Sequence, residues 1–247
     1  MKPSRGRARI GVLVPFTNCN LEPDMALMAP AGISIHVARM GGYDEDEIPG
    51  AEQMHGLGAA DLDEPLALLM GAKPDVILYG CTSATLTHGP AFDRALAARI
   101  KSASGAATVT AAGALVNALR HLGATQIGFA SPYVLEINDM AVGFLADMGV
   151  DALQRAEVTD TLDNSGQGDL SPDDVYALAI KADHPKADVL VLSCTEMRSV
   201  EAVARIEAAV GKPVITSNQA MLFAALQHLQ INEPVPGFGR LLEGTRQ

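Results

Sequence analysis

Lys73-Pro-Asp-Val-Ile-Leu-Tyr-Gly-Cys-Thr82 and Lys186-Ala-Asp-Val-Leu-Val-Leu-Ser-Cys-Thr195 are the two stretches of this sequence that decide its fold. Each is a short apolar run that begins after Lys-x-Asp and ends at a Cys-Thr pair. A run of this length, bounded by polar residues, is typical of a strand buried in a parallel sheet. The cysteines are 113 positions apart (194 − 81), which indicates an internal repeat.

Two further matches occur in the same order along the chain. Ile10-Gly-Val-Leu-Val-Pro-Phe16 aligns with Ile127-Gly-Phe-Ala-Ser-Pro-Tyr133 at an offset of 117 (127 − 10). Val109-Thr-Ala-Ala-Gly-Ala114 aligns loosely with Ile215-Thr-Ser-Asn-Gln-Ala220 at an offset of 106 (215 − 109). Offsets that drift from 117 to 106 are expected when loops differ in length, so the chain is predicted to contain two related halves.

Strand-like runs alternate with stretches of helical period throughout the chain. The strands are expected at 10–15, 76–79, 108–110, 127–130, 189–193 and 214–216, and the helices at 64–70, 91–100, 114–122, 139–148, 173–182, 200–210 and 219–229. Such alternation predicts βαβ units and parallel sheets covered by helices. The predicted fold class is α/β with two pseudo-symmetric lobes, each a short parallel sheet flanked by helices. Residues 1–115 with 226–247 form the first lobe, and 116–225 the second.

Composition and charge exclude several classes of protein. The chain has 247 residues, 48% of them hydrophobic, which is enough for a sizeable core. Its 18 Lys and Arg against 29 Asp and Glu give a net charge of −11, which disfavours nucleic acid and anionic membranes as partners. It has no apolar run of about 18 residues, and the six-residue run after the basic start is too short for a secretory signal. We therefore expect a cytoplasmic protein.

The three cysteines suit neither a disulfide scaffold nor a zinc site. Cys19, Cys81 and Cys194 lack CxxC spacing and neighbouring histidines, and no metal is predicted. The chain also has no Walker-type Gly-Lys-Ser/Thr, so no nucleotide cofactor is implied. Cys81 and Cys194 each follow a buried strand, and ligands of parallel sheets bind at the carboxyl ends of the strands. We expect both thiols in one cleft, whereas Cys19 has no partner in the repeat.

The surroundings of the two thiols predict nucleophilic chemistry. Each cysteine lies in a hydroxyl-rich turn, expected at a helix N-terminus, where free N–H groups lower a thiol pKa. Asn18 follows the first strand and Tyr133 follows its counterpart, so both are expected at the cleft edge as donors to a carboxylate. Asn164 lies in a polar loop and carries no independent signal, and the acidic run 44–47 is expected to be solvated or to lie over the cleft.

The sequence resembles the Asp/Glu racemase superfamily, in particular the branch of maleate cis-trans isomerases and arylmalonate decarboxylases. The resemblance spans nearly the whole chain. It rests on Val14-Pro-Phe-Thr-Asn18, the turn at Cys81, Ala130-Ser-Pro-Tyr133, Asp163-Asn164, Leu192-Ser-Cys-Thr-Glu-Met197 and Pro236-Gly-Phe-Gly-Arg-Leu-Leu242.

The resemblance implies a site and a mechanism without a cofactor. Cys81 would add to a double-bond carbon as a thiolate, and Cys194 would donate and accept a proton. The substrate carboxylates would be held by Asn18, Asn164, Tyr133 and the backbone around Thr82, Ser83 and Thr195. The implied ligand is a small dicarboxylate, with maleate-to-fumarate isomerisation as the best interpretation, and the branch implies a homo-oligomer.

Three alternatives remain open on the sequence. Cys194-Thr-Glu196 resembles the cysteine turn of amino-acid racemases, so a two-thiol racemase acting on an aspartate-like or hydantoin substrate is the main one. An arylmalonate-type decarboxylase is disfavoured, since the resemblance implies that those enzymes keep the second cysteine as proton donor but have a glycine where Cys81 stands. A non-catalytic metabolite-binding protein is the third possibility.

Overall fold

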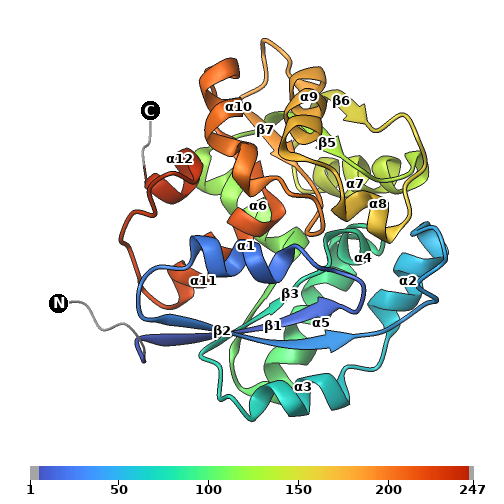
Figure 1. The fold of residues 1–247 in the computed structure, drawn as a ribbon. Coiled ribbons are helices and arrows are strands. Elements are labelled where there is room, and N and C mark those ends of the chain that lie inside the picture. The colour runs from blue at the N-terminus through green and yellow to red at the C-terminus, as the bar shows by residue number, and fades with distance from the viewer. Residues whose placement is uncertain (1–5, 245–247) are drawn as a thin grey trace.

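The computed structural model describes residues 6–244, which form two lobes, each built on a four-stranded parallel sheet (Figure 1). The first sheet has the order β2-β1-β3-β4 and the second β6-β5-β7-β8, so the two orders are equivalent. The strands are β1 (Ala8–Pro15), β2 (Ile33–Met40), β3 (Val76–Tyr79), β4 (Ala107–Thr110), β5 (Gln126–Ser131), β6 (Asp151–Glu157), β7 (Val189–Leu192) and β8 (Val214–Thr216). The expected fold class is confirmed.

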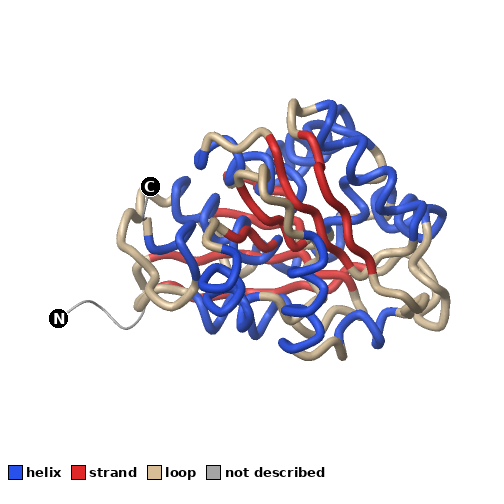
Figure 2. Tube along the Cα trace, turned by 90° about the horizontal axis from the view of Figure 1, so that it is seen from above, coloured by secondary structure: helices blue, strands red, loops and turns tan. Residues whose placement is uncertain are grey.

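Helices cover the sheets on both sides (Figure 2). In the first half of the chain these are α1 (Leu21–Met28), α2 (Ala51–Ala59), α3 (Asp63–Met70), α4 (Thr82–Leu86), α5 (Gly89–Ser104) and α6 (Ala111–Leu122). In the second half they are α7 (Leu135–Asp147), α8 (Asn164–Gly168), α9 (Pro172–Ala182), the 3-10 helix η1 (Val200–Ala202), α10 (Val203–Val210), α11 (Ser217–His228) and α12 (Gly239–Glu243). None of these helices is long and apolar enough to span a membrane.

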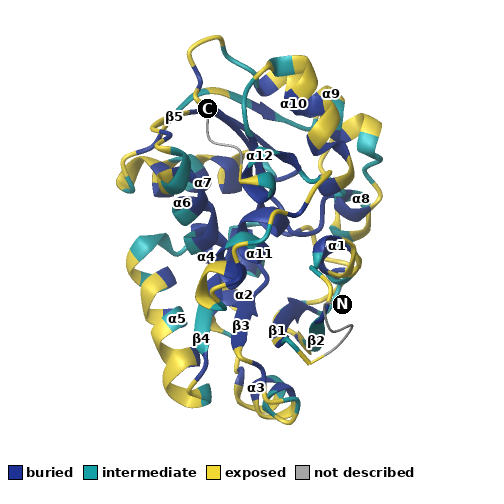
Figure 3. Cartoon of the chain, turned by 90° about the vertical axis from the view of Figure 1, so that its left-hand side faces the viewer, coloured by how far each residue is buried: buried dark blue, intermediate teal, exposed yellow. Residues whose placement is uncertain are grey.

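The alternation of side chains along each strand builds two hydrophobic clusters. In β3, Val76 and Leu78 contribute to one cluster, whereas Ile77 and Tyr79 contribute to the other. The first cluster includes residues of α1, α6 and α11 together with strands of both sheets, so it joins the two lobes. Figure 3 shows α11 as deeply buried, while α3, α5 and α9 expose their outer faces. The lobes therefore share a central helical layer.

The predicted strands and helices are all present, and the sequence analysis missed the two edge strands. β2 and β6 are mostly half-buried or exposed, so they lack the continuous apolar run that marks the inner strands. The sequence pattern also does not predict the helices α1, α2, α8 and α12, whereas α4 begins directly after Cys81, where a helix N-terminus is expected. The residue boundaries of the lobes stay a prediction, and their outermost residues, 1–5 and 245–247, lie outside the described part of the chain.

Candidate active site

All eight residues singled out in the sequence line one pocket between the lobes. They are Asn18, Cys81, Thr82, Ser83, Tyr133, Asn164, Cys194 and Thr195. The carboxyl ends of β1, β3, β5 and β7 carry six of them, directly or within three residues, because parallel strands of one sheet end at the same edge. The structure thus brings the residues together, while their action on a substrate stays a prediction.

Cys81 forms the N-cap of α4, directly after β3 and Gly80. Its thiol is buried and lies 3.6 Å from the Ser83 hydroxyl. Burial raises the pKa of the Cys81 thiol, while the backbone N–H groups of Ser83 and Ala84 oppose the rise. The predicted lowering of the pKa is therefore wrong for the unliganded protein, because desolvation outweighs the N–H groups.

Cys194 follows β7 through Ser193, and its surroundings differ from those of Cys81. The Glu196 N–H donates to Sγ at 3.3 Å, but the chain continues as a turn and becomes helical only at η1. The predicted helix N-terminus at Cys194 is thus wrong. Burial raises the pKa of Cys194 to about 12, with the N–H groups of Glu196 and Met197 opposing.

Thr195 connects the two lobes at the pocket. Its hydroxyl donates to the Gly80 carbonyl at 3.0 Å and accepts from Asn18 Nδ2 at 3.2 Å. Asn18 Oδ1 in turn accepts from the Leu21 N–H at 2.9 Å, at the start of α1. The residue before one cysteine is therefore bonded to the residue after the other, which fixes the two turns relative to each other.

The Tyr133 hydroxyl is buried beside the thiol of Cys194 and has no hydrogen-bond partner of good geometry among residues 6–244. Its backbone N–H donates to the Ser131 hydroxyl at 3.2 Å, which holds the turn after β5. A buried hydroxyl without a partner is costly unless a ligand or water completes it. The Tyr133 hydroxyl is thus available as a donor to a ligand in the pocket.

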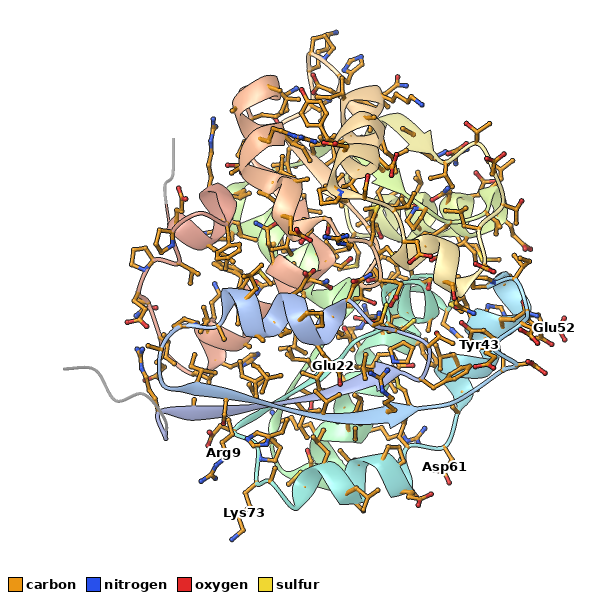
Figure 4. The ribbon with its side chains drawn as sticks, viewed as in Figure 1. Arg9, Glu22, Tyr43, Glu52, Asp61 and Lys73 are labelled. Carbon is orange, nitrogen blue, oxygen red and sulfur yellow. The ribbon has the colours of Figure 1, made fainter. Side chains whose placement is uncertain are left out.

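The Asn164 side chain is committed to the loop that follows β2. The Tyr43 hydroxyl donates to Asn164 Oδ1 at 2.6 Å, and Asn164 Nδ2 donates to the Glu45 carbonyl at 3.2 Å. Tyr43 lies on the side of the molecule where α2 and α8 face each other (Figure 4). Tyr43 and Pro49 line the pocket, and the acidic run 44–47 between them is exposed to solvent, as one of the two expectations held.

Glu196 and Gln167 line the pocket too, and the sequence analysis did not include them in the site. A signal for Glu196 exists in the repeat, since Glu196 aligns with Ser83 and puts a carboxyl where the first lobe has a hydroxyl. Its carboxylate oxygens accept from the Cys19 N–H at 3.0 and 3.1 Å, and the Cys19 thiol donates to Oε1 at 3.1 Å. Burial raises the pKa of Glu196 to about 7 and that of Cys19 to about 11.

The pocket has no cationic side chain. Over residues 6–244, its lining contains no Lys, Arg or His, and Arg198 is paired with Glu201 instead. The same residues include no cluster of His, Cys, Asp and Glu that could hold a metal ion. What the pocket offers to an anion is a set of amide, hydroxyl and backbone donors, together with two thiols.

Several known proteins are similar to this chain along nearly its whole length. Residues 10–242 match the model of a family described as arylmalonate decarboxylase. A maleate isomerase of Pseudomonas putida is 31% identical over 245 residues, which cover 96% of this chain and 98% of that protein. A maleate isomerase of Nocardia farcinica is also 31% identical, covering 96% of both chains.

A solved structure of the Nocardia farcinica maleate cis-trans isomerase adds chemical information. It is a cysteine-to-serine mutant with a covalently bound succinylcysteine intermediate. Its TM-score with this chain is 0.87 at 28% identity, and the match covers 96% of this chain and 99% of that one.

Proposed function

The chain belongs to the arylmalonate decarboxylase family, and on this premise we propose that it is a cofactor-independent cysteine isomerase that converts maleate to fumarate. The observation that carries the proposal is the pair of buried cysteines, at equivalent ends of β3 and β7, that line a single pocket. The maleate isomerases similar to this chain along nearly all of its length support the substrate.

Cys81 would act as the nucleophile. The Cys81 thiol first loses its proton to solvent. The thiolate Sγ then forms a bond to one alkene carbon of maleate as the π bond opens, and the second carbon takes the proton of the Cys194 thiol. The central bond is then single and rotates. The Cys194 thiolate removes the proton again, the C–S bond breaks, and fumarate and the Cys81 thiolate are released. The N–H groups of Ser83 and Ala84 support the thiolate of Cys81.

The remaining predicted residues would hold the carboxylates. Asn18, Thr82, Ser83 and Thr195 surround the cysteine turns, and the unpartnered Tyr133 hydroxyl is ready to donate. Asn164 would act together with Tyr43, whose hydroxyl donates a hydrogen bond to Asn164 Oδ1. Donors fixed before the substrate arrives stabilise the charge that spreads into a carboxylate during thiolate addition.

The test is incubation of the protein with maleate, followed by proton NMR. We expect the maleate alkene signal to be replaced by that of fumarate, and expect no conversion by Cys81→Ala or Cys194→Ala. Release of carbon dioxide from an arylmalonate with no conversion of maleate would contradict the proposal.

A two-thiol racemase is the second candidate, and the Glu196 carboxyl favours it. A carboxylate in a buried pocket suits a substrate that carries an ammonium group beside its carboxylates. Incubation with L- and D-aspartate in heavy water separates the two candidates. Deuterium at the α-carbon without fumarate formation from maleate would establish the racemase.

A further inference from the structure

Glu196 is an unusual neighbour for a dianion. It is 8% exposed and is the only Asp or Glu on the pocket lining, which over residues 6–244 includes no Lys, Arg or His. A dicarboxylate dianion that enters this pocket therefore meets a carboxyl group and no compensating cation. Like charges at close range in a poorly solvated site strongly disfavour one another.

The Glu196 carboxyl is held in place, so it cannot avoid the ligand by moving. Its oxygens accept from the Cys19 backbone N–H and thiol. Gly168 packs against the same carboxyl beside the Cys19 thiol, and a Cβ added there would lie 2.6 Å from Oε1. The charge of this carboxyl can change only by protonation.

No ion pair neutralises Glu196 within residues 6–244. Arg39 acts on it electrostatically, but its guanidinium is bonded to Glu22 at 2.7 Å and to the Asn18 carbonyl at 2.7 Å. The titratable or charged groups that face Glu196 or its partner Cys19 are Cys19, Asp24, Arg39, Cys81, Asp169 and Cys194. Asp24 raises the pKa of Glu196 by Coulomb repulsion, so it favours the protonated form.

We propose that Glu196 takes up a proton when the dicarboxylate binds, so that the site captures its dianion together with one proton. The inference rests on the proposed function, because it needs a dianionic substrate. Protonation removes the repulsion between the Glu196 carboxylate and the dianion. The protein with ionised Glu196 takes up one proton from the solvent for each dianion that it binds. Glu196 then acts as a positioning residue, through its charge rather than through a bond to the reacting carbons.

Protonation of Glu196 also makes the two thiols easier to ionise. An ionised Glu196 raises the pKa of both Cys81 and Cys194 by Coulomb repulsion. Neutral Glu196 thus favours both the bound dianion and the attacking thiolate. A pKa of Glu196 near 7 is consistent with a change of its charge in the working range of an enzyme.

The first test compares the KM for maleate between pH 7.5 and 9 in the wild type and in Glu196→Gln. Above the pKa of Glu196 the KM of the wild type should rise about tenfold per pH unit, because one proton must be taken up with each dianion. Glu196→Gln cannot ionise and keeps an acceptor for the Cys19 N–H, so its KM should stay flat. Glu196→Asp, which retains the charge, should keep the pH dependence of the wild type.

A second measurement does not need a variant of Glu196. Calorimetric binding of maleate to Cys81→Ala, which cannot form the covalent adduct, at pH 8 in buffers of different ionisation enthalpy should show uptake of nearly one proton. Binding without proton uptake, or an equal rise of KM in Glu196→Gln, would overturn the inference. Failure of the wild type to convert maleate at pH 6.5, with proton-linked binding intact, would overturn the proposed isomerase instead.

Discussion

The two cysteine turns occupy equivalent places in the two lobes but are built differently. In the first, Cys81 caps a helix and is followed by two hydroxyl residues, Thr82 and Ser83. In the second, Cys194 is followed by a turn whose second residue is the carboxyl-bearing Glu196. The repeated fold thus places one thiol at the same position in each lobe, and the residues that follow each cysteine give the two thiols different surroundings.

The two turns are also anchored differently to the N-terminus of α11. The Thr82 hydroxyl donates to the Ser217 hydroxyl at 2.9 Å, a neutral contact. The Thr195 carbonyl accepts from Asn218 Nδ2 at 3.1 Å, and that same amide donates to the Asp24 carboxylate at 2.6 Å. One helix therefore holds both turns, one through a neutral pair and the other through a buried acid.

The largest expected effect comes from removing each thiol in turn. Cys81→Ala and Cys194→Ala should each lower kcat by about 10³-fold or more, because isomerisation needs both thiolate addition by Cys81 and proton transfer by Cys194. Only the variant that retains Cys81 should gain the mass of one maleic acid in mass spectrometry after mixing with maleate. Leu68→Ala, at a residue that is 71% exposed on α3, is the folding and activity control. Adduct formation by Cys81→Ala would reverse the assignment of the thiols.

The residue before each cysteine offers a matched pair for stability. An added Cβ at Gly80 would lie 2.4 Å from Leu21 Cδ2 and 3.0 Å from the Leu13 carbonyl, so Gly80→Ala should destabilise the protein by about 1–3 kcal/mol. The repeat aligns Gly80 with Ser193, where a side chain is accommodated and fully buried. Ser193→Ala should change the free energy of unfolding by less than about 0.5 kcal/mol. Urea denaturation measures both, and equal losses would contradict the steric argument.

Much of this arrangement could be predicted from the sequence, and the limits have physical reasons. The inner strands show as apolar runs because both faces are buried, and the repeat located Cys81 and Cys194 at equivalent strand ends. Tyr43 lies in a loop without periodicity, and its place over the pocket depends on tertiary contacts with Asn164. The raised pKa of the thiols also depends on burial, which the local turn does not reveal.

The two anchors of α11 should respond differently to pH. Burial raises the pKa of Asp24 from 3.8 to about 7, so its contribution to stability is present below pH 3.8 and is lost as the pH rises towards 7. Asp24→Asn should therefore gain roughly 2 kcal/mol of stability relative to the wild type between pH 5 and pH 8. Ser217→Ala, which breaks the neutral anchor, should show a difference from the wild type that does not vary with pH. Parallel pH profiles of all three proteins would show that Asp24 does not titrate as proposed.

The smallest expected effect concerns salt, and it tests whether either turn depends on a cationic side chain. Over residues 6–244 the pocket lining contains no Lys, Arg or His, whereas the whole chain carries a net charge of −11. Added salt screens the long-range repulsion of a dianion but weakens short-range backbone and amide donors little. Between 0.05 and 0.3 M NaCl at pH 7, kcat/KM should rise by at most about twofold or stay level. A tenfold fall would show that a cationic side chain dominates substrate capture, and it would make Arg39, whose field reaches Glu196, the first residue to replace.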